Sequence, residues 1–382
     1  MFSGRIPMDL RPNAIAGARG RHEVPFDLTV SNPTVCGISY PESLLAPLSR
    51  PAGLVYRPEP LGIESARRAV AADYRRHGAV VDAEHVAIVA SSSEAYSFLF
   101  KLLCEPGDAI LVPYPSYPLF EHLAALDGVR AVPYRLDPDD GWQPSLPAVM
   151  PDRARAIIAV HPNNPTGSYI EQASAASLAR ACARHGLALI ADEVFLDYPL
   201  ACAERLPSLA ACAEALTFTL GGLSKSLGLP QLKLSWIASS GPGGTVEEAV
   251  RRLEFIADSY LSVATPIQLA LPLLLSEAVP VRRAILARCR ENLGALRAAA
   301  AAVPAVTVPP PQGGWSAVLR FPSTIDEEAL ALELLEQDGV AMHPGYFFDF
   351  PGRSYAVVSL LPEPRLFSEG VQRLFRRIAS KL

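Results

Sequence analysis

Up to about residue 245 the chain repeats one pattern: a short apolar run, a polar turn and a stretch with helical periodicity. Short apolar runs that alternate with helices are typical of an α/β domain with a mostly parallel sheet. We expect its strands at residues 85–90, 109–112, 155–160, 187–191, 216–220 and 232–237.

The pattern changes after about residue 245. Long helical stretches are followed by short strands with further helices between them, which predicts a second domain of the α+β class. At 382 residues the chain is also too long for one simple core. We therefore expect an N-terminal arm at 1–45 that packs with the small domain, a large domain at 46–275 and a small domain at 276–382.

Composition argues against several kinds of partner. The net charge is −5 without a basic tract, which disfavours nucleic acid. The most apolar run, residues 267–275, is too short to span a membrane, and residues 1–32 contain no apolar signal-peptide core. Six scattered cysteines without a C-x-x-C pair predict neither a disulfide framework nor a metal site. Such thiols favour a cytoplasmic location.

Polar residues stand where four expected strands end: the serines at 91–93, Asn164, Asp192 and Lys225. In an open α/β sheet, ligands bind in the crevice outside the carboxyl ends of the strands. Lys225 alone has the simple alternative of a solvated surface lysine. Its place beside the other three favours a dry pocket, where a lysine has a depressed pKa and acts as an amine nucleophile.

Each of the other points suits one part of a phosphorylated pyridine cofactor, and each has a structural alternative. The serines at 91–93 open a helix and could hold a phosphate, or simply cap that helix. Asp192 could pair with a protonated ring nitrogen, or cap the following segment. Tyr117 could stack on a ring or lie in the core. Asn164 could donate to a phenolic oxygen or make an Asx turn.

In this order and spacing, the motifs resemble those of the fold-type I pyridoxal-phosphate enzymes, specifically the class I/II aminotransferases. They are His161-Pro162-Asn163-Asn164-Pro165-Thr166-Gly167, Asp192-Glu193 and Ser224-Lys225, with Glu105-Pro106-Gly107-Asp108 and Pro344-Gly345 in support. The resemblance covers nearly the whole chain. It implies a large domain with a seven-stranded, mostly parallel sheet, pyridoxal 5′-phosphate as cofactor, and an amino donor and a 2-oxo acid as substrates.

The resemblance also implies roles for residues at matching positions. Lys225 would form a Schiff base with the cofactor and act as general acid and base. Asp192 would pair with the pyridine nitrogen, Asn164 would bind the 3-oxygen and Tyr117 would stack on the ring. The other cofactor-binding positions are Ser91, Ser92, Ser93, Phe195, Ser224 and Lys233, with Tyr56 supplied by a partner subunit. That last contact implies a homodimer with active sites at the interface. Asn32 and Arg353 are the expected substrate-binding residues.

Three cofactor-binding positions depart from the family pattern. Phe195 replaces a tyrosine that donates to the 3-oxygen, so we expect the pKa of the Schiff base to be higher than usual. Lys233 replaces a phosphate-binding arginine, which keeps the charge and loses the bidentate fork. Gly222 replaces a serine three residues before the lysine, which removes one phosphate-binding hydroxyl.

A fourth departure concerns the substrate. The family binds the substrate α-carboxylate with an arginine in the last strand, where this chain has Val357. Such a pair is strong and orienting, so its loss leaves three explanations open. Another cation (Arg353, Arg57 or Arg21) replaces it, the substrate lacks a free α-carboxylate, or the alignment slips. No arginine lies within three residues of Val357, which disfavours a slip.

We therefore expect a pyridoxal-phosphate-dependent aminotransferase that acts on an amino acid or a related amine. The alternative keeps the cofactor and breaks another bond, as a lyase, decarboxylase or cyclase of a specialised biosynthetic pathway. A third hypothesis, a regulatory binding protein, usually requires a DNA-binding module in front of this fold. Residues 1–56 are too short and too rich in proline for such a module.

Overall fold

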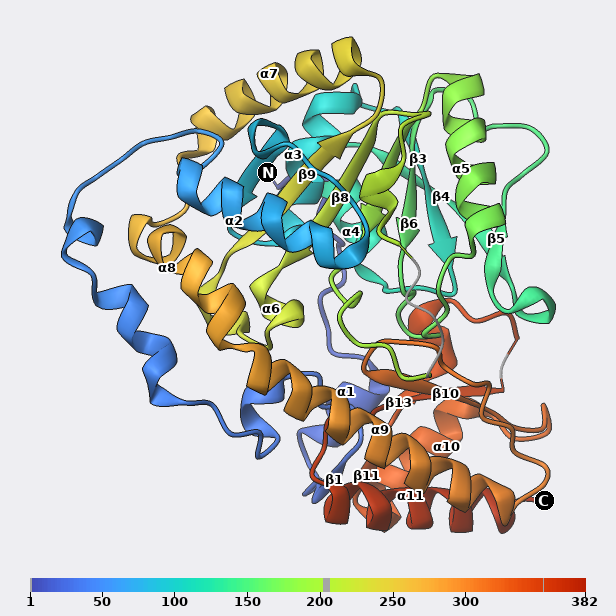
Figure 1. Ribbon diagram of the computed structural model, residues 1–382. Helices are drawn as coiled ribbons and strands as arrows, with labels where there is room; N and C mark the ends of the chain where they lie inside the picture. The colour runs from blue at the N-terminus through green and yellow to red at the C-terminus, as the bar shows by residue number, and fades with distance from the viewer. Residues whose placement is uncertain (1, 202–206, 353) are drawn as a thin grey trace.

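The computed structural model describes residues 2–201, 207–352 and 354–382. Its centre is an eight-stranded sheet in the order β2-β9-β8-β7-β6-β3-β4-β5 (Figure 1). The strands are β2 (Val86–Val89), β3 (Ala109–Tyr114), β4 (Arg130–Asp137), β5 (Gln143–Ser145), β6 (Ala154–Val160), β7 (Ala188–Asp192), β8 (Thr217–Gly222) and β9 (Ser235–Ser240). Only β9 and the edge strand β5 run against the others. The predicted mostly parallel sheet is confirmed, with β5 as an eighth strand.

Helices cover both faces of this sheet. Successive residues of each strand point to opposite sides, so apolar side chains on both faces pack against helices. Ile158 of β6 joins the core under α3, α4 and α7, whereas the neighbouring Ile157 joins the core under α5. Val86 and Ile88 of β2 lie in the core that includes α2 and α8. These helices are α2 (Glu64–Tyr74), α3 (Ser92–Leu103), α4 (Leu119–Leu126), α5 (Gln172–His185), α7 (Gly243–Tyr260) and α8 (Thr265–Glu277).

The C-terminal elements lie below the large sheet in Figure 1 and contain an antiparallel sheet in the order β10-β13-β12. They are α9 (Val279–Ala301), β10 (Ser316–Arg320), α10 (Glu327–Glu333), β11 (Val340–Ala341), β12 (His343–Pro344), β13 (Tyr355–Ser359) and α11 (Pro364–Ala379). Ala356 and Val358 of β13 pack with α9 and α11. Val357, on the opposite face, joins the core that reaches Leu111 and Leu189 of the large sheet. The two parts of the molecule therefore share buried apolar contacts.

The N-terminal segment contacts the C-terminal elements before it reaches α2. Its two regular elements are α1 (Ala14–Arg19) and β1 (Phe26–Asp27), and β1 pairs in parallel with β11. The N–H of Ser359 donates to the carbonyl of Leu28 at 2.7 Å. Beyond this contact the chain passes through two short helical turns that pack against α8. The expected division into an arm and two domains stays a prediction.

Several elements differ from the sequence-based expectation. The strand expected at 232–237 begins at Ser235, because Pro230–Leu232 form a 3₁₀ turn and Lys233 has a left-handed φ of 49°. Helix α8 was not expected, since its apolar residues surround Pro272 without clear amphipathic spacing. No helix of the described ranges is long and apolar enough to cross a membrane. Within the same ranges, no group of three or more His, Cys, Asp or Glu residues could hold a metal ion.

Candidate active site

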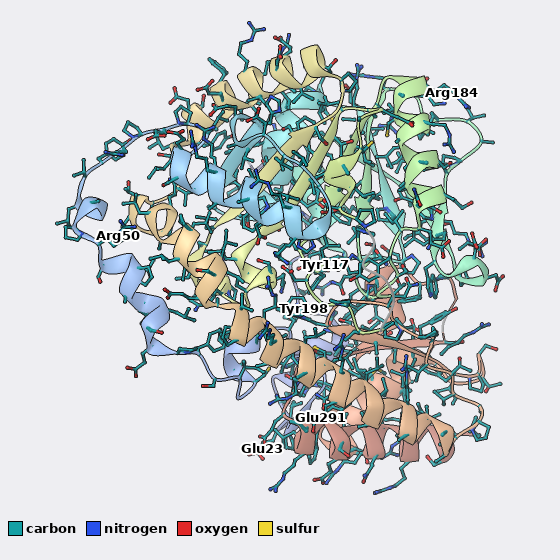
Figure 2. The ribbon with its side chains drawn as sticks, viewed as in Figure 1. Glu23, Arg50, Tyr117, Arg184, Tyr198 and Glu291 are labelled. Carbon is teal, nitrogen blue, oxygen red and sulfur yellow. The ribbon has the colours of Figure 1, made fainter. Side chains whose placement is uncertain are left out.

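A cavity of about 200 Å³ lies at the carboxyl ends of the parallel strands, and Lys225 is part of its wall. Its lining comes from three regions: strand ends and turns of the large sheet, the segments that begin α3 and α4, and residues of the arm and the C-terminal sheet. Figure 2 shows Tyr117, one of the lining residues, between the large sheet and the C-terminal elements. The lining residues used below are Ser31, Ser92, Ser93, Tyr117, Phe120, Val160, Asn164, Asp192, Phe195, Gly222, Ser224, Lys225, Ser235, Trp315, Ser316 and Ser359.

Lys225 lies in the short helix α6 (Leu223–Ser226) that follows β8. Its Nζ atom is 5.0 Å from the ring centre of Trp315 and 5.6 Å from that of Phe195. Burial lowers the pKa of Lys225, and the charge of Asp192 partly opposes this effect. The hydroxyl of Tyr198 donates to the carbonyl of Lys225 at 2.6 Å, which holds the turn in place. The result is a lysine whose amine is available as a nucleophile.

The chain has four lysines, and their surroundings differ. Lys101 forms an ion pair with Asp127, and Lys381 forms one with Glu333. Lys233 is exposed and is absent from the cavity lining, although it was predicted to bind the cofactor. Lys225 is thus the only lysine that lines the cavity.

Asp192 ends β7 and is 8% exposed. Its Oδ2 atom accepts a hydrogen bond from the hydroxyl of Tyr96 at 2.8 Å, and its Oδ1 atom accepts one from the N–H of Val194 at 3.2 Å. Burial raises the pKa of Asp192, while these two donors and the charge of Lys225 act in the opposite direction. A buried carboxylate that faces a cavity is suited to bind a protonated nitrogen.

The two asparagines of the Pro-Asn-Asn-Pro turn have separate functions in the structure. The side chain of Asn163 is used within the protein: it donates to the carbonyl of Pro115 and to Thr166, and accepts from Ser116. Asn164 lines the cavity, and its side chain has no hydrogen bond to the described residues. Of the two, Asn164 is therefore the one free to bind a ligand, as predicted from the motif.

The three serines at the start of α3 have different positions: one caps the helix and two line the cavity. Ser91 is the N-cap: its hydroxyl accepts from the N–H of Glu94 at 3.1 Å, and it does not line the cavity. Ser92 and Ser93 do line it, at the first turn of a 12-residue helix. The free N–H groups at such a helix start favour an anion.

Three further predicted residues lie outside the cavity lining or outside the described chain. Tyr56 is 71% exposed and does not reach the cavity of its own chain. The side chain of Asn32 accepts hydrogen bonds from the N–H and the hydroxyl of Thr34, so it forms a local turn, while the adjacent Ser31 lines the cavity. Arg353 lies outside the described residues. Their binding roles, like that of Lys233, stay predictions.

Several lining residues were not predicted from the sequence. Trp315, Ser316 and Ser359 come from β10, β13 and the turn before them, and Ser235 begins β9. Trp315 is 3% exposed, and its indole N–H has no acceptor in the described part of the chain. A Trp-Ser pair after two glycines gave no signal that it would approach a lysine 90 residues earlier.

Val357 lies close to the cavity and does not line it. It is 2% exposed and pairs with Val318 on one side and His343 on the other. It lies on the same face of β13 as Ser359, which does line the cavity, because residues two apart share a face. Lys225 is the only cationic side chain among the described lining residues.

The chain is similar to known proteins over most of its length. The family model described as "Aminotransferase class I and II" matches residues 57–357. The chain is 27% identical over 367 residues to the glutamate-pyruvate aminotransferase AlaA of Haemophilus influenzae, covering 91% of this chain and 89% of that protein. It is 32% identical over 303 residues to the capreomycidine synthase of Streptomyces vinaceus, covering 77% and 74%. Among solved structures, an aminotransferase from Escherichia coli matches with a TM-score of 0.88 and 25% identity, covering 99% of this chain and 98% of that one.

Proposed function

The chain belongs to the class I and II aminotransferase family, and from this premise we propose that the cavity around Lys225 is its active site. The protein is a pyridoxal-phosphate-dependent transaminase, which exchanges an amino group between an amino acid and a 2-oxo acid. One observation supports the location best: Lys225, Asp192 and Asn164 lie at or just beyond the carboxyl ends of three different strands and line one cavity.

The residues around the cavity fit this cofactor. An amine, a buried carboxylate and a free amide line one cavity, and the first turn of α3 offers N–H groups to a phosphate. Ser235 lines the cavity, and its hydroxyl has no hydrogen-bond partner among the described residues, so it is free to bind a ligand. When bound, pyridoxal phosphate supplies an electron sink for the bond broken at the amino-bearing carbon of the substrate.

The protein residues then divide the remaining tasks. Lys225 would provide the amine that holds the cofactor, and burial lowers the pKa of this amine, which favours the unprotonated form that can accept a proton. Asp192 would hold the charge of the ring nitrogen, and Asn164 would donate to the oxygen of the ring. Phe120 and Val160 are buried and keep water from the inner wall.

A second candidate reaction on the same cofactor rests on two observations. Lys225, which the cofactor requires, is the only cation among the described lining residues, so none is left for a substrate α-carboxylate. The relative with 32% identity is named for a synthase and not for an aminotransferase. Both observations favour the alternative of a lyase, decarboxylase or cyclase. The names of the aminotransferase relatives favour transamination instead. The three explanations for Val357 stay open.

A single half-reaction tests both candidates. The holoenzyme is mixed with one amino donor at a time, without an acceptor, and the absorbance of the bound cofactor is followed. We expect conversion to the amine form of the cofactor with release of a 2-oxo product. Product release with return of the starting absorbance would instead support the lyase, decarboxylase or cyclase function.

We also propose that the protein is a homodimer. Leu45, Leu54, Val55 and Tyr56 are exposed apolar residues, and their segment runs along α8, where Leu273 is exposed as well. Exposed apolar patches of this kind mark association surfaces. A second copy of the chain on this surface would bring its Tyr56 towards the cavity. Light scattering of the eluted holoenzyme measures the mass; a monomer at micromolar concentration would contradict the proposal.

A cytoplasmic location is likewise a proposal. Three described cysteines, Cys36, Cys182 and Cys289, are free and buried. Buried free thiols are typical of proteins from reducing compartments. Cell fractionation tests this directly, and recovery of the enzyme outside the cytoplasmic fraction would contradict it.

A further inference from the structure

Gly222 and Ser235 face each other across two strands in the wall of the cavity. Gly222 ends β8, three residues before Lys225, and Ser235 begins β9. They are direct partners in the antiparallel register of these strands. Both line the cavity, and Ser235 is 3% exposed.

The two positions have room for only one side chain. A Cβ atom added to Gly222 would lie 2.2 Å from the Oγ atom of Ser235 and 2.9 Å from its Cβ atom. The backbone of Gly222 is extended, with a φ of 175°, which any residue adopts. Space, and not backbone conformation, therefore requires glycine at 222, and the hydroxyl of Ser235 occupies the space that a side chain at 222 would need.

The hydroxyl of Ser235 has no hydrogen-bond partner among the described residues. Because Ser235 lines the cavity, this hydroxyl is free to donate to a bound ligand. The same cavity contains Ser224 and the first turn of α3 with Ser92 and Ser93. The N–H groups of Ser92 and Ser93 have no acceptor in the described part of the chain, since the Ser91 hydroxyl caps Glu94. These donors line the same cavity, and we call the part of the lining that carries them the anion-binding wall.

We propose that Ser235 is a phosphate-binding residue, and that its hydroxyl replaces the one that the family carries at position 222. This inference rests on the proposed active site. The group it binds is a phosphate monoester, held by neutral donors and a helix start. Lys233 is exposed outside the cavity, so each hydroxyl donor carries a larger part of the phosphate affinity.

The test compares two ligands on protein from which the cofactor has been removed: pyridoxal phosphate, and pyridoxal, which lacks the phosphate. Dissociation constants come from cofactor absorbance and quenching of tryptophan fluorescence. We expect Ser235→Ala to weaken the binding of pyridoxal phosphate about tenfold or more and to leave that of pyridoxal within about twofold. The control Ser239→Ala removes a different β9 hydroxyl, which is buried and unpartnered among the described residues and lies outside the cavity, and it should change neither constant.

A reciprocal exchange makes the test sharper. Gly222→Ser alone should weaken both ligands, because its side chain collides with Ser235. The double variant Gly222→Ser/Ser235→Gly removes the contacts with the side chain of Ser235, leaves a close contact of 3.2 Å with the Cα atom of residue 235, and moves the hydroxyl to the other strand. We expect it to recover pyridoxal phosphate affinity to within about threefold of the native chain.

Two results would overturn the inference: an equal loss for both ligands in Ser235→Ala, or no loss for either. Failure of the double variant to bind better than Gly222→Ser would also overturn it. These outcomes differ from failure of the proposed active site, in which native protein would bind pyridoxal phosphate without any dependence on Lys225. Far-UV circular dichroism of each variant identifies any that does not fold, and pyridoxal binding reports an intact ring site.

Discussion

The hydroxyl of Tyr96 donates a hydrogen bond of 2.8 Å to the carboxylate of Asp192. Tyr96 is 2% exposed and comes from α3, so this contact joins the helix that begins at the anion-binding wall to the strand that ends at the ring site. Burial alone would raise the pKa of Asp192 and favour its neutral form, and the tyrosine opposes that shift. We infer that Tyr96 is a positioning residue that keeps Asp192 charged.

Replacement of Tyr96 by phenylalanine tests this role. Loss of the donor should raise the pKa of Asp192 further and weaken its hold on a protonated nitrogen. A hydrogen bond to a charged group contributes about 1.5–3 kcal/mol, so we expect kcat to fall by about tenfold or more. We also expect the pH profile of the bound-cofactor absorbance to shift. The control is Tyr134→Phe, which removes another buried donor, at 2.8 Å from the carbonyl of Ile158. Equal effects in both variants would contradict the role.

Phe195 gives a second prediction. It is 9% exposed, lies edge-on to Trp315 with ring centres 5.3 Å apart, and lines the cavity where the family carries a tyrosine. A hydroxyl at this position supports negative charge on the 3-oxygen of the cofactor. We therefore expect Phe195→Tyr to lower the pH at which the absorbance of the bound cofactor changes. Titration of native and variant holoenzyme measures this pH. An unchanged or higher value in the variant would show that the missing hydroxyl does not set it.

The buried carboxyl group of Glu193 should make the free energy of unfolding depend on pH. This buried residue accepts hydrogen bonds of 2.6 Å from the hydroxyl of Ser208 and from the N–H of Leu209. Burial is the main cause that raises the pKa of Glu193 from 4.5 to about 8. The folded protein thus keeps a proton that the unfolded chain releases above pH 4.5. The contribution of Glu193 to stability falls as the pH rises from about 4.5 to about 8, by about 1.4 kcal/mol per pH unit.

Glu193→Gln should remove this slope, because the amide does not titrate and keeps the shape of the carboxyl group. The free energy of unfolding of both proteins, from denaturant titrations between pH 5 and 9, checks the prediction. Glu327→Gln is the matched control: Glu327 is also buried and accepts from the N–H groups of Tyr346 and Tyr355. Its pKa is raised by burial to a smaller extent, so its slope should be smaller. Parallel curves for native protein and Glu193→Gln would contradict the account.

The sequence was sufficient to predict that three polar residues lie together at one cavity. Asp192, Asn164 and Lys225 each follow an apolar run, and the carboxyl ends of parallel strands meet at one edge of a sheet. The choice of Asn164 over Asn163 depended on the motif, and the structure gives its reason, since Asn163 holds the turn itself. The local sequence pattern thus predicts which polar residues lie at the cavity when each of them stands at the end of a predicted strand.

Groups that depend on tertiary packing could not be predicted in this way. Tyr96 reaches Asp192 only because α3 packs on the sheet, and its sequence position resembles that of any core tyrosine. Trp315 approaches Lys225 because the C-terminal sheet packs against the large one. Ser235 reaches the cavity through the register of β8 and β9, and the sequence placed it inside an expected strand at 232–237, whereas it is the first residue of β9. Periodicity carries no information about such contacts.

The position of the covalent bond to the cofactor tests the central claim most directly. Holoenzyme is reduced with borohydride, which fixes a lysine-bound cofactor, and is then digested and mapped by mass spectrometry. The chain has only four lysines, Lys101, Lys225, Lys233 and Lys381, so the assignment is unambiguous. We predict that the label is on Lys225 alone and is lost in Lys225→Ala. A label on Lys233, eight residues further along the chain, or no stable label on any lysine, would contradict the account.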